Sequence, residues 1–209
     1  MAWQPYKDSR GNKVPSVTTI LGECKSPEPL LHWAWNLGME GKDFKEERNK
    51  AGVIGTWAHK AIEHYLKGTP CDNDDPKVKQ ALESFVVWFQ YTRVKIISQE
   101  LSLVCECGEH EPYGGTLDAM GLLPIISGIG GDESEVRVLD WKTSNAVYED
   151  FILQVVGYAH LWEKGHIMKS GVAIPEYFNQ SVSGYHILRV DKEHLAFHEH
   201  YWRATKELE

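Results

Sequence analysis

The segment VLDWKTS, residues 138–144, places an acid and a lysine two positions apart at the end of an apolar run. Because side chains alternate between the faces of a strand, Asp140 and Lys142 project to the same side, roughly 7 Å apart, and Trp141 projects to the other. The preceding strand, YGGTLDAMG, carries Asp118 among apolar neighbours. If the two strands form a hairpin, the two aspartates lie near one end of one face and repel unless a cation lies between them. Hard oxygen ligands of this kind suit Mg²⁺ or Mn²⁺, whereas an ion pair between Asp140 and Lys142 is the purely structural alternative.

Two other segments offer weaker candidates. His59 lies in the first turns of an expected helix, and His64 faces about 140° away from it, so the two imidazoles cannot bind one ion. Glu100 lies on the polar face of an expected strand. Gln154 and Tyr158 are four positions apart on one face of an apolar helix, where they could cap the core or contact a substrate backbone. Taken alone, each is typical of a packing or solvated side chain.

The elements that would position these residues follow from periodicity and punctuation. A short hairpin around residues 9–12 precedes a helix that Ser16 caps. Further helices are predicted over residues 29–50 and 52–66, from Pro76 through at least Phe89, and over residues 148–164, with a closing helix from Lys192. Strands are predicted over residues 94–106, 113–122, 135–141, 170–177 and 183–190, with a loop at 128–133.

This order of elements predicts one α/β domain over residues 1–209, built on a small mixed sheet flanked by helices. Residues 1–92 would form a mainly helical N-terminal part. Residues 93–209 would form the sheet core with its closing helix.

Taken together, the motifs resemble the RecB-like branch of the PD-(D/E)XK nuclease superfamily. The resemblance rests on an ordered set that runs from about residue 14 to 158: Gly55-x-x-x-His59, Glu100, Gly115-x-x-Asp118, Asp140-x-Lys142 and Gln154-x-x-x-Tyr158. The opening VPSVTTIL also resembles the start of phage and mitochondrial genome-maintenance exonucleases of that branch. A lone D-x-K is weak evidence, but five motifs in this order and spacing are specific.

The resemblance implies a restriction-endonuclease-like core with extra N-terminal helices, and a role for each motif. Asp118 and Asp140 would be the principal ligands of Mg²⁺ or Mn²⁺, with His59 and the carbonyl of Trp141 as further ligands. Glu100 would hold a water or a second ion. Lys142 would orient and activate the attacking water and steady charge on the phosphate. Gln154 and Tyr158 would hydrogen-bond the substrate backbone or fix Lys142.

Cysteines bear on two other kinds of metal site. Iron–sulfur members of the family use three cysteines after the nuclease motifs, but this chain has none beyond Cys107, so we expect no iron–sulfur cluster. CECGEH places Cys105, Cys107 and His110 close together as a zinc site would. Their spacing is poor for a closed tetrahedral site, so a strand end with incidental thiols is the favoured interpretation.

Bulk properties limit the partners. A net charge of −8 argues against broad, nonspecific binding of nucleic acid, although a local basic groove remains compatible with it. Lys42, Lys45, Arg48 and Lys50 alternate with acids, which is typical of a solvated helix face and is less often a DNA channel. Trp33, Trp35 and Trp57 could stack on bases, but core packing is the favoured interpretation for most of them.

The sequence offers neither a membrane span nor a secretory signal, so we expect a cytoplasmic protein of a bacterial or phage-infected cell. The function expected is a metal-dependent DNA nuclease, more specifically an exonuclease that acts at DNA ends or on single strands. The main alternative is a catalytically inactive nucleic-acid-binding or scaffolding domain, and a carboxylate-pair glycoside hydrolase would leave His59 and Lys142 without a role. Polarity, strand preference and oligomeric state stay open, a homo-oligomer included.

Overall fold

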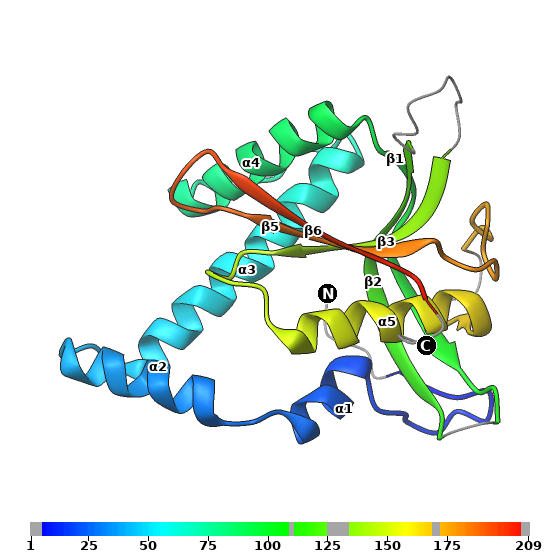
Figure 1. Ribbon diagram of the computed structural model, residues 1–209, viewed down its shortest axis with the longest axis horizontal. Coiled ribbons are helices and arrows are strands. Elements are labelled where there is room, and N and C mark those ends of the chain that lie inside the picture. The colour runs from blue at the N-terminus through cyan, green and yellow to red at the C-terminus, as the bar shows by residue number, and fades with distance from the viewer. Residues whose placement is uncertain (1–5, 109–110, 125–133, 169–171, 206–209) are drawn as a thin grey trace.

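The computed structural model describes residues 6–108, 111–124, 134–168 and 172–205. A six-stranded mixed sheet in the order β4-β1-β2-β3-β5-β6 carries helices on both faces (Figure 1). The α/β class predicted from the sequence is confirmed. The helices are α1 Val17–Cys24, α2 Glu28–Met39, α3 Phe44–Leu66, α4 Pro76–Thr92 and α5 Glu149–Lys164. The strands are β1 Lys95–Cys105, β2 Tyr113–Pro124, β3 Ser134–Lys142, β4 His166–Ile167, β5 Gly184–Val190 and β6 Phe197–Arg203.

Side-chain caps fix where the N-terminal helices begin. The Ser16 hydroxyl accepts the Thr19 N–H at 3.0 Å, so the predicted cap of α1 is confirmed. The predicted division between helices at residues 50–52 is wrong. The chain instead turns at Gly41, whose φ is +69°, and Asp43 caps α3 by accepting the Glu46 N–H. Gly52 lies inside α3, because one glycine costs a long helix only about 1 kcal/mol.

Strands β1, β2 and β3 form an antiparallel meander, which confirms the expected hairpin between the two aspartate-bearing strands. Helix α5 then returns the chain so that β5 pairs in parallel with β3. The expected loop at residues 128–133 lies outside the described residues. Among residues 172–177 the structure has no strand, and Pro175 there lacks the N–H that a sheet ladder needs.

The predicted closing helix from Lys192 is wrong. Residues 197–203 form β6, which pairs antiparallel with β5 along its whole length, from Val190↔Phe197 to Gly184↔Arg203. Pairing with β6 satisfies backbone groups of β5 that would otherwise face the edge of the sheet. That gain comes from a distant strand, so periodicity within residues 192–205 could not reveal it.

Two apolar clusters fill the two sides of the sheet. Val138 belongs to the cluster under α1 and α5, whereas Leu139 and Trp141 belong to the cluster under α3 and α4. The Trp141 ring packs edge-on against Phe85 and Trp88, with centroids 5.0 and 5.5 Å away. The alternation expected for β3 is therefore confirmed, and Asp140 and Lys142 face α5. Within the described residues, no helix combines the length and apolarity needed to cross a bilayer.

Candidate metal centre and active site

The site forms where β2 and β3 separate. Their ladder ends at the pair Ala119↔Leu139, while β3 continues beside β5 as far as Lys142. In the opening, Asp118 Oδ2 accepts the Trp141 N–H at 2.9 Å. The carboxylate thus takes the place of a backbone acceptor and is held against the segment that carries Asp140 and Lys142.

His59 reaches this opening from α3. Its Nδ1 lies 3.3 Å from Asp118 Oδ1, and 30% of the imidazole is exposed. Burial alone would lower the pKa of His59, but the carboxylates of Asp118 and Asp140 raise it to about 9. Burial alone would likewise raise the pKa of Asp118, but the imidazole and Lys142 hold it below its usual range. His59 and Asp118 therefore form an ion pair at neutral pH when no metal displaces the imidazole proton.

Glu100 lies on β1, which pairs with β2 on the edge opposite β3. One carboxylate oxygen of Glu100, one of Asp118 and one ring nitrogen of His59 all lie within 4.8 Å of one another. Partial burial, Asp118 and Glu63 raise the pKa of Glu100 to about 7. Its backbone has a φ of +49°, a left-handed conformation that is uncommon for a residue other than glycine and costs on the order of 1 kcal/mol or more.

Asp140 and Lys142 form a buried pair, not a surface one. Lys142 Nζ lies 2.5 Å from Asp140 Oδ2, and the two side chains are 14% and 1% exposed. Neither oxygen of Asp140 accepts a hydrogen bond from a described group, so the contact is an ion pair only. Burial and nearby Asp118 raise the pKa of Asp140 to about 6, even though Lys142 opposes this. Asp140 is not part of the 4.8 Å set, and one of its oxygens faces Lys142.

Two side chains of α5 contact Lys142 directly. Lys142 Nζ donates to Gln154 Oε1 at 3.2 Å, and Gln154 Nε2 donates to the Tyr158 hydroxyl at 2.8 Å. The ammonium also lies 4.8 Å from the centre of the Phe151 ring. Gly115 of β2 permits this packing, because a Cβ there would lie 2.8 Å from the Tyr158 ring. The structure therefore places Gln154 and Tyr158 so that they fix Lys142, which is one of their two predicted roles.

The structure brings the predicted residues together from five elements: His59, Glu100, Asp118, Asp140, Lys142, Gln154 and Tyr158. Trp141 contributes its N–H to Asp118, and its carbonyl as a metal ligand stays a prediction. Two residues next to the site, Glu63 and Phe151, are not predicted from the sequence. Glu63 lies one turn after His59 on α3, and the spacing His-x-x-x-Glu was the available signal. Phe151 had none, because its contact depends on how α5 packs on β3.

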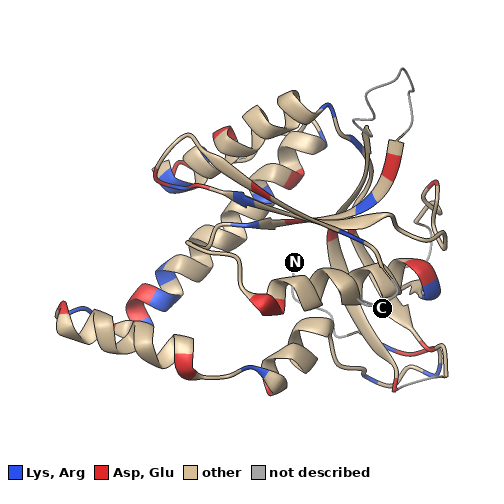
Figure 2. Ribbon diagram, in the orientation of Figure 1, with Lys and Arg blue, Asp and Glu red and all other residues tan. Residues whose placement is uncertain are grey.

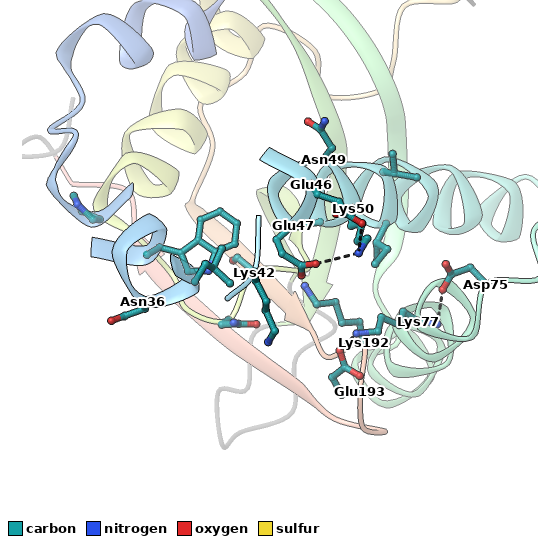
Figure 3. A pocket seen from close by; sticks show the side chains of 18 of the residues that line it. Asn36, Lys42, Glu46, Glu47, Asn49, Lys50, Asp75, Lys77, Lys192 and Glu193 are labelled. Carbon is teal, nitrogen blue, oxygen red and sulfur yellow. Dashed lines mark hydrogen bonds and ion pairs between the residues drawn. The ribbon is translucent and has the colours of Figure 1, made fainter. Parts of the chain in front are cut away.

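A groove of about 1360 Å³ begins beside this site. Its wall includes Ile54 of α3 and also Ser144 and Asn145, which lie two and three residues after Lys142, the end of β3. The metal-binding candidates do not line it. Figure 3 shows its lysines converging from α3, α4, the turn before α3 and the turn after β5: Lys42, Lys50, Lys77 and Lys192.

Charge in the groove is nearly balanced. Lys50 pairs with Glu46 and Glu47 at 2.8 and 3.1 Å, and Lys77 pairs with Glu193. Figure 2 shows positive and negative positions interspersed along the first part of α3. The basic run expected here is therefore mostly a solvated helix face, from which Lys42 and Lys50 alone reach the groove.

The expectation that Trp33, Trp35 and Trp57 are mostly core residues is wrong. Trp35 is 63% exposed, and Trp33 lines the groove with its ring edge-on to Phe44. Trp57 is partly exposed, with Lys60 Nζ 4.6 Å from its ring centre. Helix α2 protrudes from the sheet (Figure 1), so an apolar stripe on it does not imply burial.

Comparison with family models gives no match, and comparison with curated proteins gives none either. Among solved structures, one described as "Crystal structure of SSO0001" aligns over 75% of this chain and 66% of that protein, just under two thirds of its length. The sequence identity is 11% and the TM-score 0.32, a likeness too weak to carry an argument about fold or function. The function of this chain has therefore to be inferred from the geometry and chemistry of its own site.

Proposed function

We propose that this chain is a metal-dependent deoxyribonuclease of the RecB-like branch of the PD-(D/E)XK superfamily, more specifically an exonuclease. The observation that carries the proposal is the gathering of His59, Glu100, Asp118 and Asp140 next to a buried lysine. These groups come from three strands and one helix, and their carboxylates crowd one another.

The donor set fits a hard divalent cation. Asp140 is a buried carboxylate whose two oxygens accept no hydrogen bond from a described group. Lys142 supplies one positive charge to this carboxylate, but Asp118 adds a second buried negative charge nearby, and that crowding is costly unless a further cation binds. Asp118 and Asp140, with His59 and Glu100, would hold Mg²⁺ or Mn²⁺. When bound, the ion supplies positive charge to the phosphate and lowers the pKa of a water that attacks it.

The protein's own groups position the other participants. Asp140, Gln154 and the Phe151 ring hold the Lys142 ammonium in one orientation. The ammonium is therefore already positioned when the phosphate binds. Fixed positive charge at that place stabilises the charge that develops as the water oxygen bonds to phosphorus and the P–O bond to the leaving group breaks.

The groove supports the choice of a DNA end or single strand as substrate. It begins two residues after Lys142, and partly exposed Trp33 lies on its wall for stacking on a base. Its paired lysines offer modest electrostatic attraction, in keeping with the acidic net charge. DNA would therefore be held mainly by stacking and by the metal site.

The test is digestion of 5′- and 3′-labelled single- and double-stranded DNA, with a closed circle alongside, in Mg²⁺ or Mn²⁺. We expect shortening from ends, no cutting of the circle, and no cleavage by Asp140→Asn. Asp150→Asn is the matched control, because Asp150 is an acid paired with Lys25 at the surface.

A cut circle would replace exonuclease by endonuclease. Equal activity of Asp140→Asn and wild type would refute the assigned chemistry. A wild-type sample that binds DNA and leaves every substrate intact with each metal would favour the inactive binding domain instead.

A further inference from the structure

A second group of metal-binding side chains lies at the far end of the β1–β2 hairpin. Cys105 is the last residue of β1, Cys107 follows in the turn, and His160 faces them from α5. One ligand atom from each of the three lies within 4.8 Å of the others. The group is five residues along β1 from Glu100, roughly 17 Å at the rise of a strand, so it is distinct from the carboxylate site.

The three side chains are held in place by the fold. Cys105 is fully buried and is paired in the ladder with Tyr113 of β2. The Tyr113 hydroxyl lies 2.7 Å from His160 Nδ1, and the two rings are stacked with centroids 6.0 Å apart. A histidine that binds metal typically has its ring oriented by such a hydrogen bond. Gly108, with a φ of +80°, turns the chain directly after Cys107.

We propose that Cys105, Cys107 and His160 bind a zinc ion that ties the β1–β2 hairpin to α5. Two thiolates and an imidazole suit zinc, whereas the oxygen-rich site at the strand opening suits Mg²⁺ or Mn²⁺. Both thiols lose their protons to solvent when the ion binds, and a fourth ligand completes the tetrahedron.

A zinc ion at this place would support the catalytic side of the molecule indirectly. Helix α5 carries Gln154 and Tyr158, which hold Lys142. Fixing the far half of α5 to the hairpin limits its movement against β2, where Tyr158 already packs on Gly115. The ion would thus act as a structural staple, and Cys105, Cys107 and His160 would not touch substrate.

The test uses the full chain, reduced and stripped of metal, and titrates it with Co²⁺ as a spectroscopic stand-in for zinc. We expect the intense near-ultraviolet absorption of thiolate bound to cobalt, saturating at one ion per chain, and displacement of that ion by Zn²⁺. Cys107→Ser should abolish this absorption and weaken zinc binding by at least about 100-fold, because even second-sphere changes cost 10- to 100-fold. Cys107 is exposed, so its replacement should not disturb the core.

Cys24→Ser is the matched control, since Cys24 is an exposed thiol on α1, and it should behave as wild type. Zinc should also raise the unfolding temperature of wild type and Cys24→Ser by more than that of Cys107→Ser, which keeps only the carboxylate site. Wild type without thiolate absorption, or Cys107→Ser with undiminished absorption, would overturn the proposal. So would mass spectrometry that finds Cys105 and Cys107 joined as a disulfide in protein purified without reductant. None of these measurements depends on DNA cleavage, so the zinc proposal and the nuclease proposal can fail separately.

Discussion

The opening between β2 and β3 and the groove beside it differ in how far their charged side chains are buried. At the opening, His59, Asp118, Asp140 and Lys142 are largely withdrawn from water, and Asp140 has no hydrogen-bond donor among the described groups. In the groove, Lys42, Lys50 and Lys77 lie at the surface and each is paired with an acid. Two neighbouring carboxylates in a low dielectric, each paired with only one cationic side chain, favour the binding of a further cation, whereas charges already paired in water favour it little.

This difference implies that chemistry resides at the opening and that the groove contributes modest binding. Substitutions at the opening should alter the rate of the chemical step by orders of magnitude. Substitutions in the groove should alter KM by small factors. If the two sets of variants behave alike, this division of roles is wrong.

Among substitutions that spare the candidate metal ligands, the largest effect is expected for Lys142→Met. Loss of the ammonium should lower kcat about 1000-fold, within the range for a group that assists proton transfer and charge stabilisation. Mn²⁺ binding, followed by calorimetry, should persist because the carboxylates remain. Lys25→Met is the control, as Lys25 is half exposed and pairs with Asp150 at the surface. An equal loss of kcat in both variants would show that Lys142 has no specific role in the chemical step.

The ion pair of His59 should make the free energy of unfolding of the metal-free protein depend on pH. The folded pKa of His59, about 9, lies above its ordinary value, so its ion pair contributes fully below pH 6.5 and is lost as pH rises through 9. The contribution is at most about 3 kcal/mol in the free energy of unfolding. Urea denaturation at pH 6.5 and 9 should show a fall in wild type that His59→Gln reduces. His32→Gln, on an exposed part of α2, should retain the fall, and an unchanged fall in His59→Gln would exclude the ion pair.

Gln154 and Tyr158 hold Lys142 in place, so their substitution should lower kcat less than loss of Lys142 itself. Gln154→Ala removes the acceptor of Lys142 Nζ, and a hydrogen bond to a charged group is worth about 1.5–3 kcal/mol, so kcat should fall roughly tenfold or more. Tyr158→Phe should cost less, because it acts on Lys142 only through Gln154. Single-turnover rates would measure both, with Gln90→Ala on the exposed face of α4 as the control. A larger loss in Tyr158→Phe than in Gln154→Ala would mean that Tyr158 contacts substrate itself.

The smallest effect belongs to the groove. Lys42→Ala should raise KM for single-stranded DNA about two- to threefold and leave kcat unchanged, because an exposed, paired lysine contributes under about 1 kcal/mol. Lys45→Ala, on the same run but outside the groove, should change neither constant. A tenfold rise in KM for Lys42→Ala would contradict the modest role in binding assigned to the groove.

Part of the site could be predicted from local periodicity, whereas the placing of His59 and Glu100 in it depends on the resemblance to the nuclease family. Alternation along β3 placed Asp140 and Lys142 on one face, and four-residue spacing placed Gln154 beside Tyr158, as the structure has them. What failed depended on distant partners. Residues 197–203 became a strand because β5 had an open edge, and His160 approached Cys105 and Cys107 because α5 packs across the hairpin. No pattern within either segment carries that information.

The most direct test of the central claim is a crystal structure with Mn²⁺, using its anomalous scattering to locate the ion. We predict a peak in the opening between β2 and β3, about 2.1 Å from carboxylate oxygens of Asp118 and Asp140 and adjacent to Lys142. A difference map with no peak there at saturating Mn²⁺, while Asp118 still pairs with His59 and Asp140 with Lys142, would contradict it.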